Sequence, residues 1–154
     1  MRARQLAADF PTVSADTSAM EAARLLADHG LPGLIVVDAE RRPTAVLPGS
    51  QVLRAIIPRY VQDDPALARV FDEDHADKLC ERLAGKRVAD LIEPDRRPPP
   101  IVDANATAME IASVMASAHS PVVAVSDDTH RTNAPMIGVI TVAQLLTRLL
   151  PAQP

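Results

Sequence analysis

The 154-residue chain is short of cysteine, of aromatic residues and of long apolar runs. Its single cysteine, Cys80, excludes an internal disulfide and any zinc site built from several cysteines. Three aromatic residues are too few for a surface on which nucleic-acid bases stack, and the net charge of −4 also disfavours such a partner. No apolar run approaches the ~20 residues of a membrane-spanning helix, and no signal peptide is evident at the N-terminus. We therefore expect one folded cytoplasmic domain with no nucleic-acid partner and no membrane insertion.

Glycine is also scarce, whereas proline is abundant: the chain has 5 glycines and 14 prolines. So few glycines would scarcely build a phosphate-cradling loop. So many prolines exclude an uninterrupted helical bundle, because proline lacks the N–H group that helix interiors need. No arrangement of serine or cysteine with histidine that is typical of nucleophilic catalysis can be argued, so we predict no catalytic residue and no enzyme.

The first part of the chain recurs near its C-terminus. Shifted by 89 residues, positions 13–38 align with positions 102–127, and ten of these 26 pairs are identical. At an offset of 93, further identical pairs follow, among them Val46 and Val139, Gln51 and Gln144, and Pro58 and Pro151. The order of the matches indicates an internal duplication.

Each repeat has the pattern strand, helix, strand, strand, helix. The sequences Ser18-x-x-Glu21 and Thr107-x-x-Glu110 are capping boxes, which begin the first helix of each repeat. After an extended start, the elements expected in the first repeat are a helix to about residue 28, strands at 34–37 and 44–47, and a helix at 51–57. Those expected in the second are a helix to about 118, strands at 122–125 and 136–140, and a helix at 142–150. We predict an α/β fold in which two β-α-β-β-α units pack about a pseudo-two-fold axis, because one unit cannot cover its sheet alone.

The duplication divides the chain into unit one (1–58), an acidic insert (59–85) and unit two (86–154). Residues 62–85 carry seven acidic and three basic residues. Their net charge of −4 equals that of the whole chain. Apolar residues at helical spacing predict one or two amphipathic helices that begin at Asp64-Pro65. The stripe consists of Leu67, Val70, Phe71, Leu79, Cys80 and Leu83. It packs on its own module, on a dimer mate or on a partner, and we expect Cys80 to be buried in it.

A run of acidic residues in the insert could suggest a metal site. It consists of Asp72, Glu73, Asp74, His75 and Asp77. The run lacks the glycine and the terminal glutamate of a calcium-binding loop. We interpret it as a solvated helix face and predict no metal ligand.

These motifs resemble the CBS domain family, named for cystathionine β-synthase, whose units occur in tandem pairs called Bateman modules. Residues 119–125 and 138–146 match the family's proline-apolar strand and the Gly-apolar-apolar-Thr/Ser motif that opens the last helix. Residues 30–38 match the first of these motifs in unit one. The resemblance covers residues 1–58 and 86–151, and we expect a homodimer.

The resemblance implies an adenosine-containing ligand in the cleft between the units. AMP, ADP, ATP and S-adenosylmethionine are the implied ligands, and no cofactor is required. In the family, a Thr/Ser and above all an Asp hold the ribose hydroxyls, because charge-assisted hydrogen bonds are about twice as strong as neutral ones. The ligand-binding residues that this implies in unit two are Ser120, Pro121, Val122, Thr141 and Gln144.

Both units depart from the family at the ribose position. Glutamine stands in place of the Asp in each, as Gln51 and Gln144, and Pro48 replaces the Thr/Ser of unit one. Unit one is therefore expected to hold a degenerate site, which comprises Leu31, Pro32, Pro48 and Gln51. In unit two, Thr141-x-x-Gln144 is itself a capping box, so these residues either only cap a helix or also contact a ligand.

Basic groups near the expected cleft have two interpretations. His119 either serves only as the end of a helix, where a cation suits the helix dipole, or also touches a ligand phosphate. Arg131 is likewise considered for contact with a ligand phosphate. The run from Arg96 to Pro100 either stiffens the linker or approaches a phosphate, and we favour the linker.

Two functions follow from the resemblance. The first is a stand-alone regulatory protein that senses an adenosine-containing ligand and acts in trans on a partner protein. The second is a ligand-free dimerisation and interaction module that uses the acidic insert for docking. In both cases the resemblance implies a transporter or a metabolic enzyme as the partner.

Overall fold

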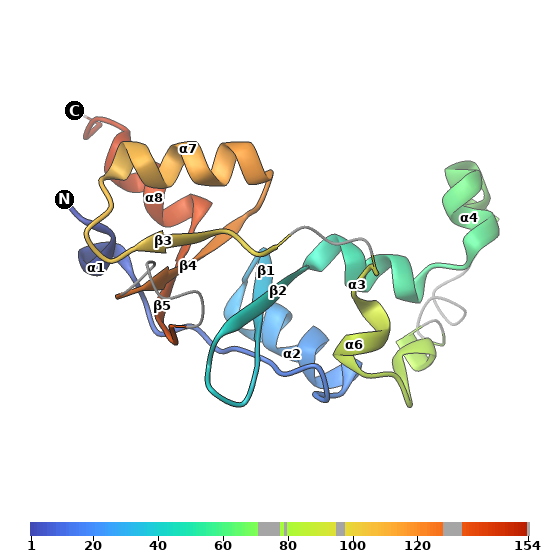
Figure 1. Ribbon diagram of the computed structural model, residues 1–154. Coiled ribbons are helices and arrows are strands. Elements are labelled where there is room, and N and C mark those ends of the chain that lie inside the picture. Colours follow the sequence, from blue (N-terminus) through green and yellow to red (C-terminus); the bar gives the residue numbers. More distant parts are fainter. Residues whose placement is uncertain (71–77, 79, 95–97, 128–133, 154) are drawn as a thin grey trace.

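Two sheets of different size form the two units of the molecule (Figure 1). The computed structural model describes residues 1–70, 78, 80–94, 98–127 and 134–153. In unit one, β1 (Gly33–Val37) pairs antiparallel with β2 (Pro43–Pro48). In unit two, β4 (Val122–Ser126) lies between β3 (Ile101–Asp103), which is parallel to it, and β5 (Met136–Thr141), which is antiparallel. The predicted α/β fold is confirmed.

Helices cover each sheet in the expected order. Unit one carries α2 (Ala19–His29) and α3 (Gly49–Ile56), and unit two carries α7 (Ala108–Ala118) and α8 (Val142–Leu149). Both predicted caps begin their helices: the hydroxyl of Ser18 accepts the N–H of Glu21 at 3.1 Å, and that of Thr107 accepts the N–H of Glu110 at 3.2 Å. The N–H of Thr107 also donates to the Glu110 carboxylate at 2.9 Å, which completes the box of α7, whereas α2 forms only the hydroxyl half of its box. α3 begins two residues before the predicted start because β2 runs directly into it.

The strand expected at the start of unit one is reduced to a single bridge. Val13 pairs in parallel with Val36, donating to the carbonyl of Ile35 and accepting from Val37. The pairing stops there because the chain turns at once: the N–H of Ser14 donates to the hydroxyl of Thr17 at 3.0 Å.

The two units exchange short helices. α1 (Ala3–Leu6) packs in the core of unit two, and α6 (Val88–Leu91) packs in the core of unit one. The hydrogen bonds are reciprocal, because Ala3 donates to the carbonyl of Ala106 at 2.9 Å and Val88 donates to that of Thr17 at 2.8 Å. In Figure 1, α1 accordingly lies beside the sheet of unit two. The boundaries at residues 58 and 86 therefore follow the repeat along the chain, whereas the packing crosses them.

The units join through a small apolar core of their own. Its buried residues are Ile35, Val122, Ala124, Met136 and Val139, with Phe10, Val37 and Val46 packed at its margin. β1 of unit one contacts β4 of unit two there. The pseudo-two-fold packing expected from the duplication thus places the two sheets against each other.

The hairpin between β1 and β2 reaches unit two as well. Its turn is organised by Asp38, which accepts the N–H groups of Glu40 and Arg42 and the guanidinium of Arg42 at 2.7 Å. Partial burial raises the pKa of Asp38, but these hydrogen bonds and the charge of Arg42 outweigh it and hold that pKa below its ordinary value. The carbonyl of Arg41 accepts the N–H of Met136 at 3.0 Å, which ties the turn to β5.

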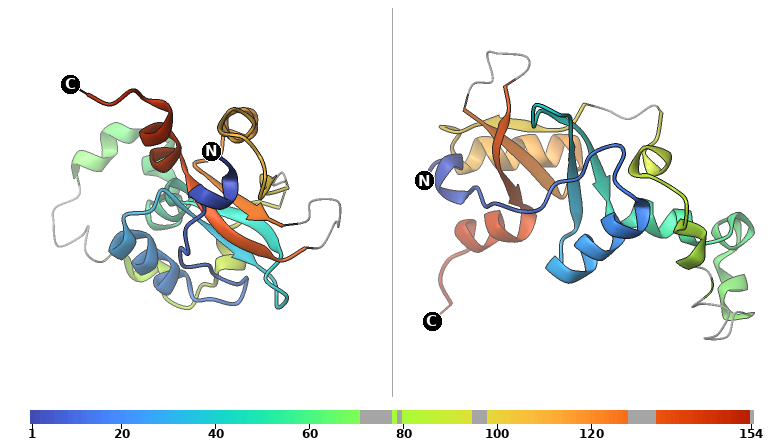
Figure 2. Two further views of the ribbon diagram at one scale, coloured as in Figure 1. Left: turned by 90° about the vertical axis from the view of Figure 1, so that its left-hand side faces the viewer. Right: turned by 90° about the horizontal axis from the view of Figure 1, so that it is seen from below.

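The insert extends beyond unit one, as two further views show (Figure 2). It contains α4 (Arg59–Asp63) and two 3₁₀ helices, η1 (Pro65–Val70) and η2 (Cys80–Leu83). A helix begins at Pro65 as predicted, although as a 3₁₀ helix. Leu83 is buried in the core of unit one, whereas Leu67 is exposed. Part of the predicted stripe therefore packs on its own module.

The expected burial of Cys80 is wrong, because its side chain is exposed. η2 is only four residues long, and Leu83 at its end already fills the space against unit one. Phe71, Leu79 and the acidic run at 72–77 lie outside the described residues. Within the described residues, no helix has the length and apolar character needed to cross a membrane.

Candidate functional site

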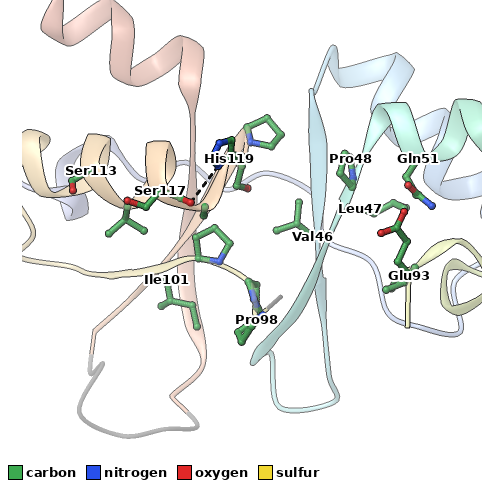
Figure 3. A pocket seen from close by; sticks show the side chains of 17 residues that line it. Val46, Leu47, Pro48, Gln51, Glu93, Pro98, Ile101, Ser113, Ser117 and His119 are labelled. Atoms are coloured by element: carbon green, nitrogen blue, oxygen red, sulfur yellow. Dashed lines mark hydrogen bonds between the residues drawn. The ribbon is translucent and has the colours of Figure 1, made fainter. Parts of the chain in front are cut away.

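A cleft of about 830 Å³ lies between the two units (Figure 3). Unit one contributes residues 46–48 and Gln51, where β2 passes into α3. Unit two contributes the C-terminal half of α7 and the residues that follow it, through Pro121. The linker between α6 and β3 supplies the remaining wall with residues 92–93 and 98–101.

The lining combines an apolar surface with a few polar groups. The apolar part includes Ile92, Ile101, Pro121 and the three consecutive prolines at 98–100. The polar side chains that line it are Gln51, Glu93, Ser113, Ser117, His119 and Ser120. Small-molecule sites typically have this character, with an apolar lining and a few polar groups that fix orientation.

The cleft takes residues from both sets of predicted site residues. Ser120 and Pro121 come from the predicted ligand-binding set, and Pro48 and Gln51 come from the set predicted to be degenerate. Val122 is buried in the core between the units. The sequence repeat suggests one site in each unit. The cleft instead combines the start of α3 in unit one with the residues that precede β4 in unit two.

The other predicted residues do not line this cleft. Leu31 and Pro32 precede β1, and the carbonyl of Pro32 accepts the N–H of Gly49 at the start of α3. Thr141 and Gln144 form the capping box of α8: the N–H of Thr141 donates to Oε1 of Gln144 at 2.9 Å, and the N–H of Gln144 donates to the Thr141 hydroxyl at 3.3 Å. The capping interpretation is confirmed, and ligand contact at these residues stays a prediction.

The linkers after the exchanged helices differ in length, and this opens the cleft on one side of the molecule. Six residues (7–12) lie between α1 and Val13, whereas ten residues (92–101) lie between α6 and Val102, the equivalent of Val13. After α1, Ala8 and Val139 exchange two backbone hydrogen bonds of 3.0 Å, so the chain covers the outer edge of β5. The equivalent residues, Glu93 and Val46, both line the cleft. The outer edge of β2 therefore borders open space where that of β5 is covered.

Glycine allows the close approach of the N-terminal segment. A Cβ at Gly138 would lie 2.8 Å from the Cβ of Ala7 and 3.2 Å from the carbonyl oxygen of Ala8. The equivalent position in unit one is Ala45, and no isolated backbone bridge joins β2 to the described residues of the longer linker. The difference in linker length is visible in the sequence, but its effect on the cleft depends on the exchange of α1 and α6.

Helix α7 lines the cleft with small side chains. Ser113, Ser117 and Ala118 occupy the positions that Arg24, Asp28 and His29 occupy on α2. Three bulky or charged side chains of the first repeat are thus replaced by small ones. This substitution leaves room in the cleft that the longer linker also opens.

His119 holds an unusual backbone conformation at the edge of the cleft. Its φ is +51°, in the left-handed region, where the equivalent residue of α2 is Gly30 with a φ of +60°. Outside glycine, such a conformation is strained. Nδ1 lies 3.3 Å from the carbonyl oxygen of Ser117, which can only accept, so Nδ1 is the donor in this contact (Figure 3). His119 lines the cleft as expected, whereas Arg96, Arg97 and Arg131 lie outside the described residues.

The described charges of the cleft are few. Glu93 pairs with Arg54 at 3.3 Å, and both side chains are well exposed. An ion pair in that setting contributes little to stability, so the carboxylate of Glu93 can turn toward a ligand. No cluster of three or more His, Cys, Asp or Glu side chains that could hold a metal occurs among the described residues.

A duplicated α/β module with a cleft between its halves defines the class of this protein: a tandem pair of small α/β units. The chain belongs to the CBS domain family, whose model matches residues 3–58 and 88–151. The resemblance to this family that the sequence motifs indicated is thereby confirmed. No significant match is found among curated proteins.

Solved structures with the same architecture span nearly the whole chain. A CBS domain-containing protein of unknown function from Kribbella flavida is 44% identical, with a TM-score of 0.80, and the match covers 98% of this chain and 99% of that one. CBSX2 in complex with AMP is 17% identical, with a TM-score of 0.64 and coverage of 96% and 94%. The CBS domain pair of MJ0100, in complex with 5′-methylthioadenosine and S-adenosyl-L-methionine, is 18% identical, with a TM-score of 0.62 and coverage of 97% and 94%. The last two show likeness in fold.

Proposed function

We propose that this CBS pair is a regulatory, non-catalytic module that binds an adenosine-containing ligand in the cleft between its units and acts on a partner protein. The observation that carries the proposal is the cleft of about 830 Å³. Its volume lies within the ~300–1,000 Å³ range of small-molecule sites. The AMP and S-adenosyl-L-methionine complexes of the two distant relatives support this class of ligand.

A ligand in this cleft would contact both units at once. It would lie between the start of α3 in unit one and the end of α7 in unit two. A ligand shifts a conformational equilibrium only by its difference in affinity for the two states. Because the walls belong to different units, a change in their relative position changes the contacts, and a partner can detect that change. We expect the partner to be a transporter or a metabolic enzyme.

Calorimetry and thermal unfolding with AMP, ADP, ATP and S-adenosylmethionine test this proposal. We expect saturable heat and a raised melting temperature with at least one of them. The change Ser117→Trp fills the cleft and abolishes the effect. Ala116→Trp places the same side chain on an exposed position of the same helix and preserves it. The absence of heat and of any melting shift at millimolar ligand concentrations would rule the proposal out.

A second candidate function, a ligand-free interaction module, is supported by a different observation. The hydroxyl and carboxylate that hold ribose in the family are absent from the described cleft, where Pro48 and Gln51 stand instead. Apolar side chains on the two short helices are also left exposed, namely Leu53 on α3 and Val142, Leu146 and Leu149 on α8. Exposed apolar side chains of this kind support self-association, and we propose a homodimer.

The insert provides the test of this second candidate. Replacing residues 62–78 by a short glycine-serine linker removes most of the insert but keeps η2 and its packing residue Leu83. If the insert docks a second copy or a partner, the dimer mass in light scattering or the capture of a candidate transporter or enzyme is lost. An unchanged mass together with unchanged capture contradicts this role.

A further inference from the structure

We propose that Gln51 reads the base of the bound ligand with its side-chain amide, and that Pro48 is the residue that leaves this amide free to do so. The proposal rests on the proposed adenosine-binding function and narrows it. It states that the selectivity of the cleft comes mainly from hydrogen bonds to the edge of the base, and that the ribose hydroxyls contribute little.

The two short helices begin in different ways, although both carry glutamine at the same position. At the start of α8, Oε1 of Gln144 accepts the N–H of Thr141 at 2.9 Å and lies 3.4 Å from its hydroxyl. The hydroxyl of Thr141 in turn accepts the N–H of Gln144 at 3.3 Å. The amide oxygen of Gln144 is thus committed to holding its own helix.

Proline makes this arrangement impossible at the start of α3. Pro48 stands in the position of Thr141 and has neither a backbone N–H nor a hydroxyl. The Gln51 side chain therefore has no capping partner, and its amide makes no hydrogen bond to any described part of the chain. Gln51 is half-buried and lines the cleft, as Glu93 does (Figure 3). A polar amide that faces a ligand-sized space without a partner is available for recognition.

The chemistry of an amide fits a base better than a ribose. A carboxylate only accepts hydrogen bonds, which suits two neighbouring hydroxyl donors. An amide presents one acceptor and two donors in a plane, so it pairs with a heterocycle edge that has a donor beside an acceptor. Glutamine reads adenine in this way in nucleic-acid recognition, through the 6-amino group and an adjacent ring nitrogen. Pro98–Pro100, Ile101 and Pro121 supply apolar surface for the faces of a flat ring.

Three nucleosides distinguish recognition of the base from recognition of the ribose. Adenosine is compared in calorimetric titrations with purine riboside, which lacks the 6-amino group, and with 2′-deoxyadenosine, which lacks one ribose hydroxyl. For the wild-type protein we expect purine riboside to bind about fivefold more weakly than adenosine, the effect of one lost hydrogen bond. We expect 2′-deoxyadenosine to bind within about twofold of adenosine, since an amide contributes less than a carboxylate at the ribose.

Two variants test whether the difference in affinity between adenosine and purine riboside depends on the amide of Gln51. They also test whether Pro48 keeps this amide from capping α3. Gln51→Met keeps the length of the side chain, removes the amide and makes adenosine and purine riboside bind equally. Pro48→Thr supplies an N–H and a hydroxyl at the helix start, so the amide of Gln51 caps α3 as that of Gln144 caps α8. We expect this variant to lose the same discrimination although Gln51 is still present. Gln5→Met is the matched control, because it removes another capping glutamine far from the cleft.

The outcomes separate this inference from the proposed function. If wild-type protein binds none of the nucleosides or nucleotides, the proposed function fails and this inference fails with it. If adenosine binds but Gln51→Met keeps the preference over purine riboside, only this inference is overturned. A tenfold loss of affinity for 2′-deoxyadenosine overturns it as well, because the ribose would then be the group that is read. Should Pro48→Thr not fold, as judged by its melting curve, the Gln51→Met ratios decide.

Discussion

Single positions at which the two repeats differ account for much of the asymmetry of this molecule. Pro48 stands opposite Thr141, and His119 stands opposite Gly30. Each change alters a backbone requirement: proline removes a hydrogen-bond donor, and histidine replaces glycine in a left-handed conformation. Pro48 and His119 both line the described cleft. Strain and missing caps tend to collect at functional sites in this way.

Substitutions at the C-terminal ends of α2 and α7 measure the strain at His119. His119→Gly removes the left-handed strain, and we expect it to raise the free energy of unfolding by about 1 kcal/mol, less the greater entropy of glycine in the unfolded chain. Gly30→Ala should lower it by about 1 kcal/mol, since no atom within 4 Å would obstruct the new Cβ and only the backbone conformation matters. Urea unfolding gives both values. A destabilised His119→Gly variant would show that the imidazole contributes more to the free energy of unfolding than the strained backbone conformation takes from it.

Gly138 is expected to be the least replaceable of the described strand residues of unit two. Gly138→Ala brings a Cβ to 2.8 Å from the Cβ of Ala7, so the N-terminal segment must move off β5. Overpacking of this kind costs about 1–3 kcal/mol. Gly49→Ala is the control, because its nearest contact is an ordinary 3.6 Å to the carbonyl of Pro32. Hydrogen exchange at Ala8 and Val139 should increase in the first variant only, and equal exchange in both would contradict the close approach.

Among the elements, α1 and α6 are short helices that neither unit can form from its own repeat. Each lies in the core of the opposite unit, where Leu6 and Leu91 are buried. An isolated four-residue helix is not stable in water, so tertiary packing holds both. Each unit therefore needs a segment from the other end of the chain, and this couples the folding of the two units.

η2 is the part of the insert that we expect to matter for stability. Leu83→Ala removes a side chain with 2% of its surface exposed, and such truncations cost about 2–5 kcal/mol. Leu67→Ala, at 38% exposure in η1, should change stability by less than about 1 kcal/mol. Chemical denaturation of the two variants tests this order. Similar small losses in both would mean that the insert is not anchored on unit one.

For the whole molecule, the unequal linkers predict one ligand per chain rather than two. The longer linker and the small side chains of α7 open the described cleft, whereas Ala8 covers the edge of β5 on the other side. Titration with the tightest-binding nucleotide should therefore give a stoichiometry near one. The double change Ser113→Arg with Ser117→Asp gives α7 the side chains of α2 and should abolish binding.

The reciprocal change on α2 is the control for that experiment. Arg24→Ser with Asp28→Ser gives α2 the small side chains of α7, and we expect one equivalent of ligand to bind with unchanged affinity. The edge of β5 stays covered by the N-terminal segment in that variant. Two equivalents in the wild-type protein, or binding that survives the change on α7, would place the ligand elsewhere.

The duplication, the order of elements and the capping boxes followed from local patterns in the sequence. Periodicity and caps act within a few residues, so α2, α7 and α8 and the apolar strands were predictable from one segment at a time. The family followed from the order of the same motifs, and its model matches both repeats. The predicted pairing of Thr141 with Gln144 is local as well, since they lie three residues apart.

The cleft depended on contacts between distant parts of the chain. The sequence by itself determined that each unit has a proline-led strand and a glutamine near the start of its last helix. Only the tertiary structure decided that Pro121 of one unit and Gln51 of the other line the same space. It also decided that the exchange of α1 and α6 leaves a ten-residue linker beside β2 but places Ala8 on β5. Hydrogen bonds between distant segments, such as Ala8 with Val139 and Val88 with Thr17, made that choice, and no local pattern encodes it.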